Sequence, residues 1–121
     1  GGRSNVAGDD SGADRTVGKA SAVLAGDENR AEADLAAVSG GYNNTASGPW
    51  SSISGGHSNT ASGSYSSVLG GGDNIAGDYY ASVSGGRENT ASAYYSSVSG
   101  GYQRSVSGNH NWRAGSLFET Q

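Results

Sequence analysis

Residues 38–52 read VSGGYNNTASGPWSS, and residues 53–67 repeat the phrase as ISGGHSNTASGSYSS. The same fifteen-residue phrase, with more substitutions at its two ends, extends from residue 23 to residue 112. A short period that keeps its phase over many repeats indicates a solenoid, in which each repeat forms one coil and stacks on its neighbours. The first residue of each phrase is apolar, and these residues form the predicted core ladder: Val23, Val38, Ile53, Val68, Val83 and Val98.

Composition alone would suggest a disordered chain, because 22 of the 121 residues are Gly and only 33% are hydrophobic. The constant phase of the Val column argues against disorder. The net charge is −4 and the seven basic residues do not cluster, which disfavours nucleic acid and anionic membranes as partners. The chain has no run of about 20 apolar residues, so we expect no membrane insertion by this segment and, in the absence of Cys, no disulfide framework.

Each coil is expected to contain two short strands, which makes the fold class all-β, a parallel β-solenoid of fifteen-residue coils. Alternating polar and apolar residues around Val or Ile predict the first strand, as in Ser52-Ile53-Ser54. The Asn-Thr-Ala-Ser segment predicts the second strand, with Ala facing inward. Gly-Gly is expected to turn one corner and Ser-Gly the other, because Gly adopts positive φ readily. The second corner would use Gly48, Gly63 and Gly108.

The sequence divides into three parts. Residues 1–22 are expected to form an imperfect first coil, because Gly1-Gly2-Arg3-Ser4-Asn5 matches the repeat but lies nine positions too early. The excess falls in the acidic segment near residues 9–18, which we interpret as a loop. Residues 23–112 form six coils. Residues 113–121 are a C-terminal cap or tail, and we expect Trp112, Leu117 and Phe118 to cover the end of the core.

Stacking turns each column of equivalent residues into a ladder. The Asn column is expected to pair amide to amide along the axis. An aromatic ladder is predicted at Trp50, Tyr65, Tyr80 and Tyr95, continued by His110, with a second aromatic column beginning at Tyr79 and Tyr94. One coil buries only one Val and one Ala, which is little against the entropy of ordering fifteen residues. We therefore expect further buried surface through self-association, at the aromatic columns or at the Val and Ala faces.

No constellation of residues supports catalysis or metal binding. His57 and His110 fall in different coils, and the periodic Ser residues have no candidate base beside them, so we expect no enzyme activity, no catalytic residue and no cofactor. The acidic segment Asp9-Asp10-Ser11-Gly12-Ala13-Asp14 lacks the spacing of a calcium loop and is interpreted as solvated, so no metal site is expected. A Thr column, Thr45, Thr60 and Thr90, leaves ice binding as a lesser alternative, although Ile75 and Ser105 interrupt it.

The phrase Ser-Val-x-x-Gly-x-x-Asn-x-Ala-x-Gly resembles the head repeats of trimeric autotransporter adhesins, the YadA-like heads. The matching positions include residues 52–56 and 59–63 and their equivalents across residues 23–112. The resemblance implies a left-handed parallel β-roll, three chains side by side as a homotrimer, and a role in attachment at the cell surface. Departures from the family are the period of fifteen instead of fourteen, Gly in place of the strand Ile, and the added aromatic column.

The turn residues that differ from coil to coil are the candidate contact surface, since variable side chains on a rigid scaffold are where binding usually occurs. These residues are Tyr42, His57, Arg87 and Tyr102. We hypothesise a non-enzymatic extracellular adhesive head or fibre segment that associates with itself and binds a host matrix protein or glycan. The alternative is a structural subunit of a secreted filament or phage-like fibre, assembled by end-to-end stacking of coils.

Overall fold

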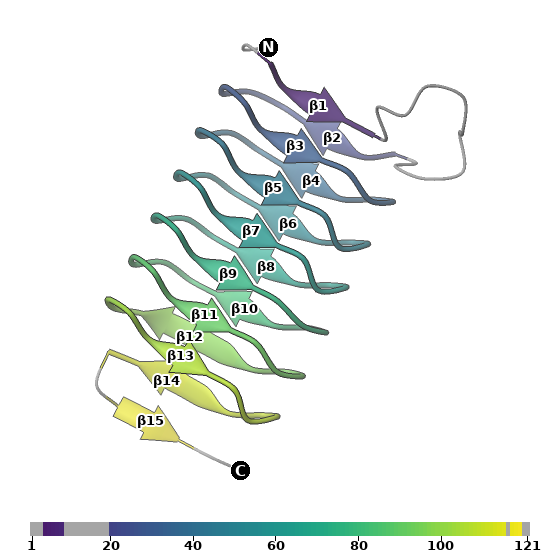
Figure 1. The fold of residues 1–121 in the computed structure, drawn as a ribbon. Coiled ribbons are helices and arrows are strands. Elements are labelled where there is room, and N and C mark those ends of the chain that lie inside the picture. Colours follow the sequence, from purple (N-terminus) through teal and green to yellow (C-terminus); the bar gives the residue numbers. More distant parts are fainter. Residues whose placement is uncertain (1–3, 9–19, 116, 120–121) are drawn as a thin grey trace.

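The fold, taken from a computed structural model, is a parallel β-solenoid built from two sheets that face each other (Figure 1). The structure describes residues 4–8, 20–115 and 117–119. Sheet A holds the seven strands β1 (Val6–Ala7), β3 (Arg30–Ala31), β5 (Thr45–Ala46), β7 (Thr60–Ala61), β9 (Ile75–Ala76), β11 (Thr90–Ala91) and β13 (Ser105–Val106). Sheet B holds the eight strands β2 (Ala22–Val23), β4 (Ala37–Val38), β6 (Ser52–Ile53), β8 (Ser67–Val68), β10 (Ser82–Val83), β12 (Ser97–Gly100), β14 (Trp112–Ala114) and β15 (Leu117–Glu119).

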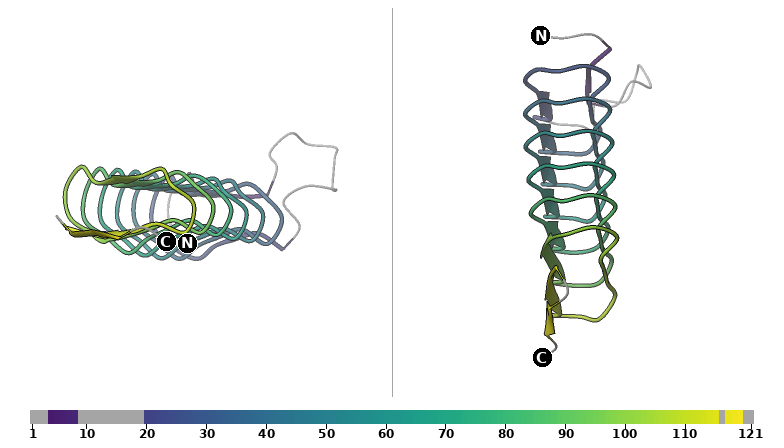
Figure 2. Two further views of the ribbon diagram at one scale, coloured as in Figure 1. Left: turned by 90° about the horizontal axis from the view of Figure 1, so that it is seen from below. Right: turned by 90° about the vertical axis from the view of Figure 1, so that its left-hand side faces the viewer.

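Paired residues of neighbouring coils are fifteen positions apart, which is the period of the sequence. Thr45 pairs with Thr60 in sheet A, and Ile53 pairs with Val68 in sheet B, in both cases fifteen positions apart. Consecutive strands from β1 to β14 alternate between the sheets, so each repeat makes one flattened coil with a turn at each edge (Figure 2). The prediction of an all-β solenoid with coils of fifteen residues is therefore confirmed.

The early Gly-Gly phrase joins the same register after an insertion. Val6 pairs with Arg30, which lies 24 positions later, whereas Ala22 pairs with Ala37, which lies 15 positions later. Nine extra residues are therefore accommodated between β1 and β2. The segment expected to form the loop, residues 9–18, lies outside the described residues.

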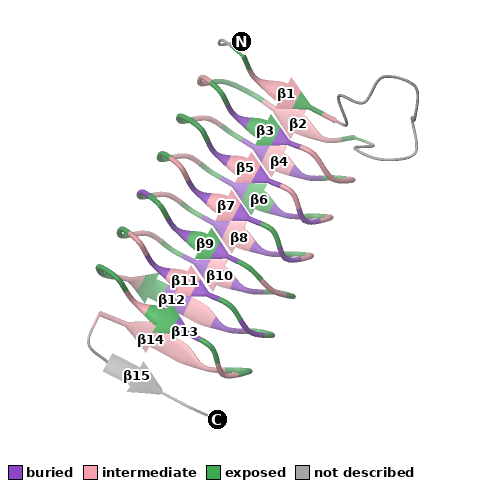
Figure 3. Ribbon diagram, in the orientation of Figure 1, coloured by how far each residue is buried: buried purple, intermediate pink, exposed green. Residues whose placement is uncertain are grey.

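Four columns of buried residues run along the solenoid. Figure 3 shows buried segments recurring from coil to coil along the ribbon. Two of these columns are the predicted Val and Ala columns, with Val38, Ala46 and their equivalents between residues 31 and 106 fully or almost fully buried. Val23, in the first of these coils, is only partly buried. The other two columns are polar or small: an Asn column that includes Asn44, and a column of Ser and Ala residues that includes Ser51. The sequence did not single out this last column as part of the core.

The Asn column binds the backbone more than it binds itself. The amide nitrogen of Asn44 donates to the carbonyls of Gly40 (3.1 Å) and Gly56 (3.0 Å), and its oxygen accepts from the backbone N–H of Asn59 (3.0 Å). Amide-to-amide pairing occurs only between Asn44 and Asn29 among the described Asn residues (3.1 Å). The expected ladder of paired side-chain amides is therefore wrong, because the turns offer each amide nitrogen two backbone carbonyls and each amide oxygen a backbone N–H of the next coil.

The two corners of the coil use Gly in different ways. Gly41 has a φ of 92°, as expected for the Gly-Gly corner. Gly48 and Gly63 do not have positive φ. The prediction that the second corner needs Gly because of its backbone conformation is therefore wrong. A Cβ at Gly63 would instead collide with the backbone of Asp78 in the next coil, so close packing of successive coils excludes a side chain there. Positive φ at this corner belongs to the aromatic ladder, for example Tyr65 at 60°.

The C-terminal end of the solenoid differs from the cap expected from the sequence. Trp112 lies opposite Ser97 in the outward column of sheet B, and its indole nitrogen donates to the hydroxyl of Ser99 (2.6 Å). Trp112 therefore does not cover the core. Arg113 takes the core position opposite Val98, and its Nη1 donates to the carbonyl of Ser105 in β13 (3.3 Å), which links the two sheets at this end. Strand β15 pairs antiparallel with β14, and the side chains of Leu117 and Phe118 lie outside the described part.

Candidate functional site

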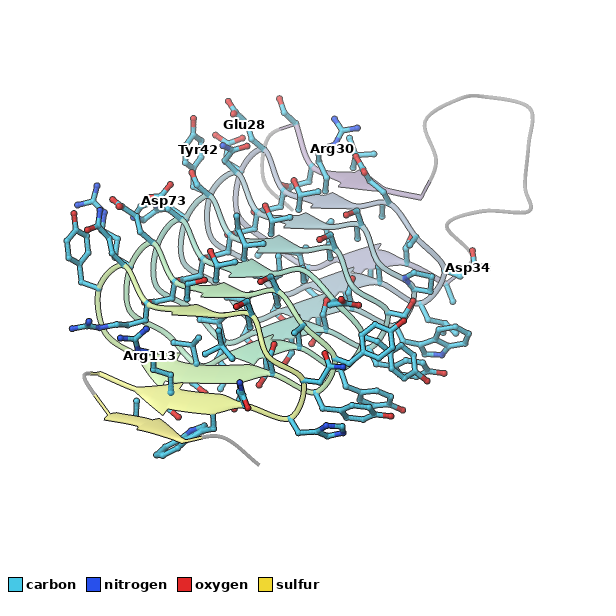
Figure 4. The ribbon with its side chains drawn as sticks, turned by 60° about the horizontal axis from the view of Figure 1, so that its bottom comes forward. Glu28, Arg30, Asp34, Tyr42, Asp73 and Arg113 are labelled. Atoms are coloured by element: carbon cyan, nitrogen blue, oxygen red, sulfur yellow. The ribbon has the colours of Figure 1, made fainter. Side chains whose placement is uncertain are left out.

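The two edges of the flattened coils carry different side chains. We define the variable edge as the column Asp27, Tyr42, His57, Gly72, Arg87 and Tyr102, whose neighbouring members form parallel bridges. We define the aromatic edge as Trp50, Tyr65, Tyr79, Tyr80, Tyr94, Tyr95 and His110. Figure 4 shows Tyr42 and Asp73 on one edge, whereas Asp34, which shares the aromatic edge, lies on the other.

All four predicted contact residues lie on the variable edge. Tyr42 and Tyr102 are half exposed, and His57 and Arg87 also face solvent. The positions that follow the members of this edge in the chain, including Asn43, Asp73 and Glu88, have φ near 55°. Their N–H groups donate to carbonyls of the preceding coil, as Ser58 does to Tyr42 (2.9 Å). The bridged backbone therefore fixes the spacing of this edge while leaving the side chains free to differ.

The N-terminal half of the variable edge is acidic around a phenol. The negative charge of Glu28 raises the pKa of Tyr42 above its ordinary value of 10.0, and a hydrogen bond between the two side chains and the charge of Asp27 act in the same direction. Tyr42 therefore remains a neutral hydrogen-bonding group at physiological pH. Two coils further along, a side chain on Gly72 would collide with the imidazole of His57, so the small residue makes room for that ring.

The C-terminal half of the variable edge is a mixed charge cluster. Arg87 lies 3.7 Å from a carboxylate oxygen of Asp73 and 3.4 Å from one of Glu88. Gln103 donates to the other oxygen of Glu88 (2.8 Å). These contacts are exposed, so they add little stability and leave the charged groups available to a ligand.

The aromatic edge contains one continuous stack. Ring centroids are separated by 5.0 Å between Trp50 and Tyr65, 4.8 Å between Tyr65 and Tyr80, and 5.3 Å between Tyr80 and Tyr95. His110 continues the stack 5.1 Å from Tyr95, and all these pairs are parallel within 6°. The rings stack because each backbone N–H bonds one coil back, as Tyr80 does to Ser64 (3.0 Å), which repeats the same geometry at every corner.

The second aromatic column leans against the first. Tyr79 meets Tyr80 edge to face at 4.6 Å and lies 6.0 Å from Tyr94 with a tilt of 50°. Partial burial among these rings raises the pKa of Tyr79, and the neighbouring phenols of Tyr80, Tyr95 and Tyr65 raise it further. Spacing predicted the column itself. The perpendicular packing depends on side-chain rotation, which has no sequence signal.

Catalytic geometry is not assembled in the described part of the chain. His57 lies on the variable edge and His110 on the aromatic edge, so the two imidazoles are on opposite sides of the coil. Groups of three or more His, Asp or Glu that could hold a metal ion do not occur among the described residues. The acidic segment Asp9–Asp14 lies outside them. The described residues also contain no helix long and apolar enough to cross a membrane.

The Thr column lies on the outer face of sheet A. Thr45, Thr60 and Thr90 are partly exposed, and Ile75 interrupts them with a side chain that is also exposed. On the outer face of sheet B, the described side chains are uncharged and mostly small, and Leu24, Leu69 and Trp112 are the larger ones. Sequence reasoning did not identify this second face, although the same fifteen-residue count would have shown it.

Comparison of the sequence with protein-family models and with curated proteins finds no match.

Proposed function

We propose that the protein is a non-enzymatic extracellular scaffold, an adhesive head or fibre segment that binds ligands through the variable edge. The observation that carries this proposal is the contrast between the constant inward columns and the changing column of the variable edge. The inward columns repeat with little change, whereas the bridged column of the variable edge presents an acid, two phenols, an imidazole and a guanidinium in turn. A rigid frame with one variable column is typical of repeat proteins that bind other molecules.

The ligand that suits this edge is a host matrix protein or a glycan. Tyr and Arg are enriched at protein interfaces, and phenol and carboxylate groups also bind sugar hydroxyls. The extracellular or cell-surface location rests on the resemblance to the YadA-like heads and agrees with the scarcity of basic residues, which disfavours nucleic acid as a partner.

Three copies side by side, each a left-handed roll, are the assembly that the resemblance implies. The Val and Ala columns lie inside each chain, so they are not available as the interface between copies. The outer face of sheet B suits that role better, because the side chains that the structure describes there carry no charge and are mostly small enough to allow close approach of a second sheet.

The filament alternative requires coils of different copies to continue one parallel ladder. Strand β15 runs antiparallel at the C-terminal end of sheet B, so a second copy could not extend that sheet in the parallel register. This strand favours the discrete assembly over the filament.

Light scattering after size exclusion tests the assembly over a concentration series. We expect a constant mass near three times 12.0 kDa. A mass that grows with concentration would support the filament, and a stable monomer would overturn both assemblies.

An array of glycans and matrix proteins tests the binding function. We expect wild type to bind at least one class of spot, and the variant Tyr42→Ser, His57→Ser, Arg87→Ser, Tyr102→Ser to lose that binding. The matched control changes the sheet A face by Thr45→Ser, Thr60→Ser and Thr90→Ser, and should bind as wild type does. Binding that is absent, or equal in all three proteins, would contradict the proposal.

A further inference from the structure

We propose that the aromatic edge is a site of oxidative modification, at which a one-electron oxidant joins neighbouring coils through dityrosine bonds. The residues concerned are the tyrosine cluster, defined as Tyr65, Tyr79, Tyr80, Tyr94 and Tyr95. This inference does not depend on the binding function of the variable edge, which lies on the opposite side of the coil.

The cluster places phenol rings from three successive coils in contact. Tyr80 lies between Tyr65 at 4.8 Å and Tyr95 at 5.3 Å, with both partners parallel to it within 5°. Tyr79 and Tyr94 are 6.0 Å apart with a tilt of 50°, which resembles the twist between two directly joined rings. Each of these three pairs links residues fifteen positions apart, so a bond within any pair would join adjacent coils.

The rings are also accessible to an oxidant and to water. Between 36% and 51% of each cluster residue is exposed. The proposed trimer packs through the face of sheet B, which leaves this edge in solvent. Oxidation of a phenol removes a proton along with the electron, and water at the exposed edge can accept that proton.

A haem peroxidase with hydrogen peroxide supplies an oxidant of the required class. Two phenols each lose one electron and one proton to give phenoxyl radicals, while hydrogen peroxide takes up two electrons and two protons to give two waters. The radicals form a carbon–carbon bond between their ortho carbons. The hydrogen on each of these carbons then moves to its own oxygen, which restores both phenols, and the pair has lost two hydrogens in total.

Contact between the rings makes coupling within the chain faster than coupling between molecules. Fixed neighbours react with effective concentrations far above those reached in solution. The product would tie coils together as a disulfide does, by restricting the unfolded chain. The chain contains no Cys, so a disulfide cannot supply such a cross-link within it.

Peroxidase treatment of the full chain at low micromolar concentration tests the proposal. We expect dityrosine fluorescence and peptides, identified by mass spectrometry, that join cluster residues of different coils with the loss of two hydrogens. A mixture of ¹⁴N and ¹⁵N chains should give links within chains of one label. The oxidised protein should also melt at a higher temperature than the untreated protein.

Two matched variants locate the reaction. Tyr→Phe at all five cluster positions keeps the rings but removes the phenols, and should lower the yield of links within chains by about tenfold or more, as expected when a preorganised pair is lost. Tyr42→Phe with Tyr102→Phe removes two equally exposed phenols from the variable edge and should leave the yield unchanged. Links that join differently labelled chains, links that involve Tyr42 or Tyr102, or equal yields in both variants would overturn the proposal.

Discussion

At the scale of single residues, two adjacent asparagines show that position in the coil decides whether a side chain is buried and what it bonds. Asn44 is fully buried and bonds the backbone of its own coil and of the next, whereas Asn43 is exposed and makes one long contact of 3.5 Å with Ser58. The amide of Asn44 bonds the backbone N–H of Asn59 in a fully buried contact and the carbonyls of Gly40 and Gly56 in part-buried ones. Each such group that loses its partner carries a desolvation cost.

Asn44→Ser should therefore lower the free energy of unfolding by about 2 kcal/mol or more, because the buried N–H of Asn59 loses its acceptor and the part-buried carbonyls of Gly40 and Gly56 each lose a donor. Asn43→Ser is the matched control and should change it by about 0.5 kcal/mol or less, because Ser58 already occupies the equivalent position in the next coil. Chemical denaturation measures both values, and similar losses in the two variants would contradict this view of the Asn column.

The Ser and Ala column supplies a second comparison within one environment. The hydroxyls of Ser51 and Ser66 are buried without a hydrogen-bond partner, while the hydroxyl of Ser96 donates to the carbonyl of Ala93 (2.6 Å). Ala36 and Ala81 occupy the same column, so a methyl group fits there.

Ser51→Ala and Ser66→Ala should each raise the free energy of unfolding by about 1 kcal/mol, because they remove an unpaired buried hydroxyl. Ser96→Ala should lower it by a similar amount, because a hydrogen bond is lost. Thermal and urea unfolding report the sign, and destabilisation by all three changes would show that the hydroxyls of Ser51 and Ser66 are satisfied in solution.

Positive φ at the aromatic corner is costly for a residue with a side chain, by about 1 kcal/mol or more. A stacked ring pair returns about 0.5–1.5 kcal/mol, and Tyr80 takes part in two such pairs. The stacking energy therefore offsets the cost of positive φ at the same residues. This explains how bulky residues are tolerated at φ values near 57°.

At the scale of elements, the fifteen-residue period predicted strand pairing and residue positions better than hydrophobicity did. It predicted which residues pair in β4 to β12, because parallel in-register pairing needs only a constant period. The same count assigns Trp112 to the outward column of Ser97, yet its apolar character suggested a cap. Hydrophobicity mispredicted the position of Trp112 because its indole N–H donates a hydrogen bond to the hydroxyl of Ser99 on the outer face.

Other features could not be predicted because they depend on atoms of the turns. The amide of Asn44 bonds to carbonyls whose positions follow from the φ of Gly41 and its neighbours. For the candidate site, spacing placed all four variable residues in one column. It could not show that Glu28 raises the pKa of Tyr42, or that Arg87 forms ion pairs with both Asp73 and Glu88.

Arg113 is the residue that the structure assigns to the C-terminal end of the core. Arg113→Ala should speed amide exchange in β13 and β14 by about tenfold, because it removes a charged hydrogen bond between the sheets. Hydrogen exchange followed by mass spectrometry provides the measurement. Trp112→Ala should leave β13 unaffected, and the reverse ranking of the two variants would restore Trp112 as the cap.

At the scale of the whole molecule, stability is approximately the sum of coils and of the contacts between neighbouring coils. Deleting residues 68–82 removes one full period and joins Ser67 to Val83 in the original phrase. We expect this protein to fold with the same circular dichroism per residue and a lower melting temperature. Deleting residues 68–80 leaves Ala81 and Ser82 as two extra residues between Ser67 and Val83, inside a strand position, and should lower the melting temperature further than the fifteen-residue deletion does. Equal behaviour of the two deletions would contradict a fold defined by register.

The in-register pairing of equivalent residues also has a genetic meaning. One coil corresponds to a whole number of codons, and where the codons of neighbouring coils also match, their coding segments can misalign during replication. Such slippage would add or remove a complete coil without disturbing the reading frame or the columns. The length of the rod can therefore evolve in single steps, each producing a foldable protein with a longer or shorter row of side chains on its variable edge.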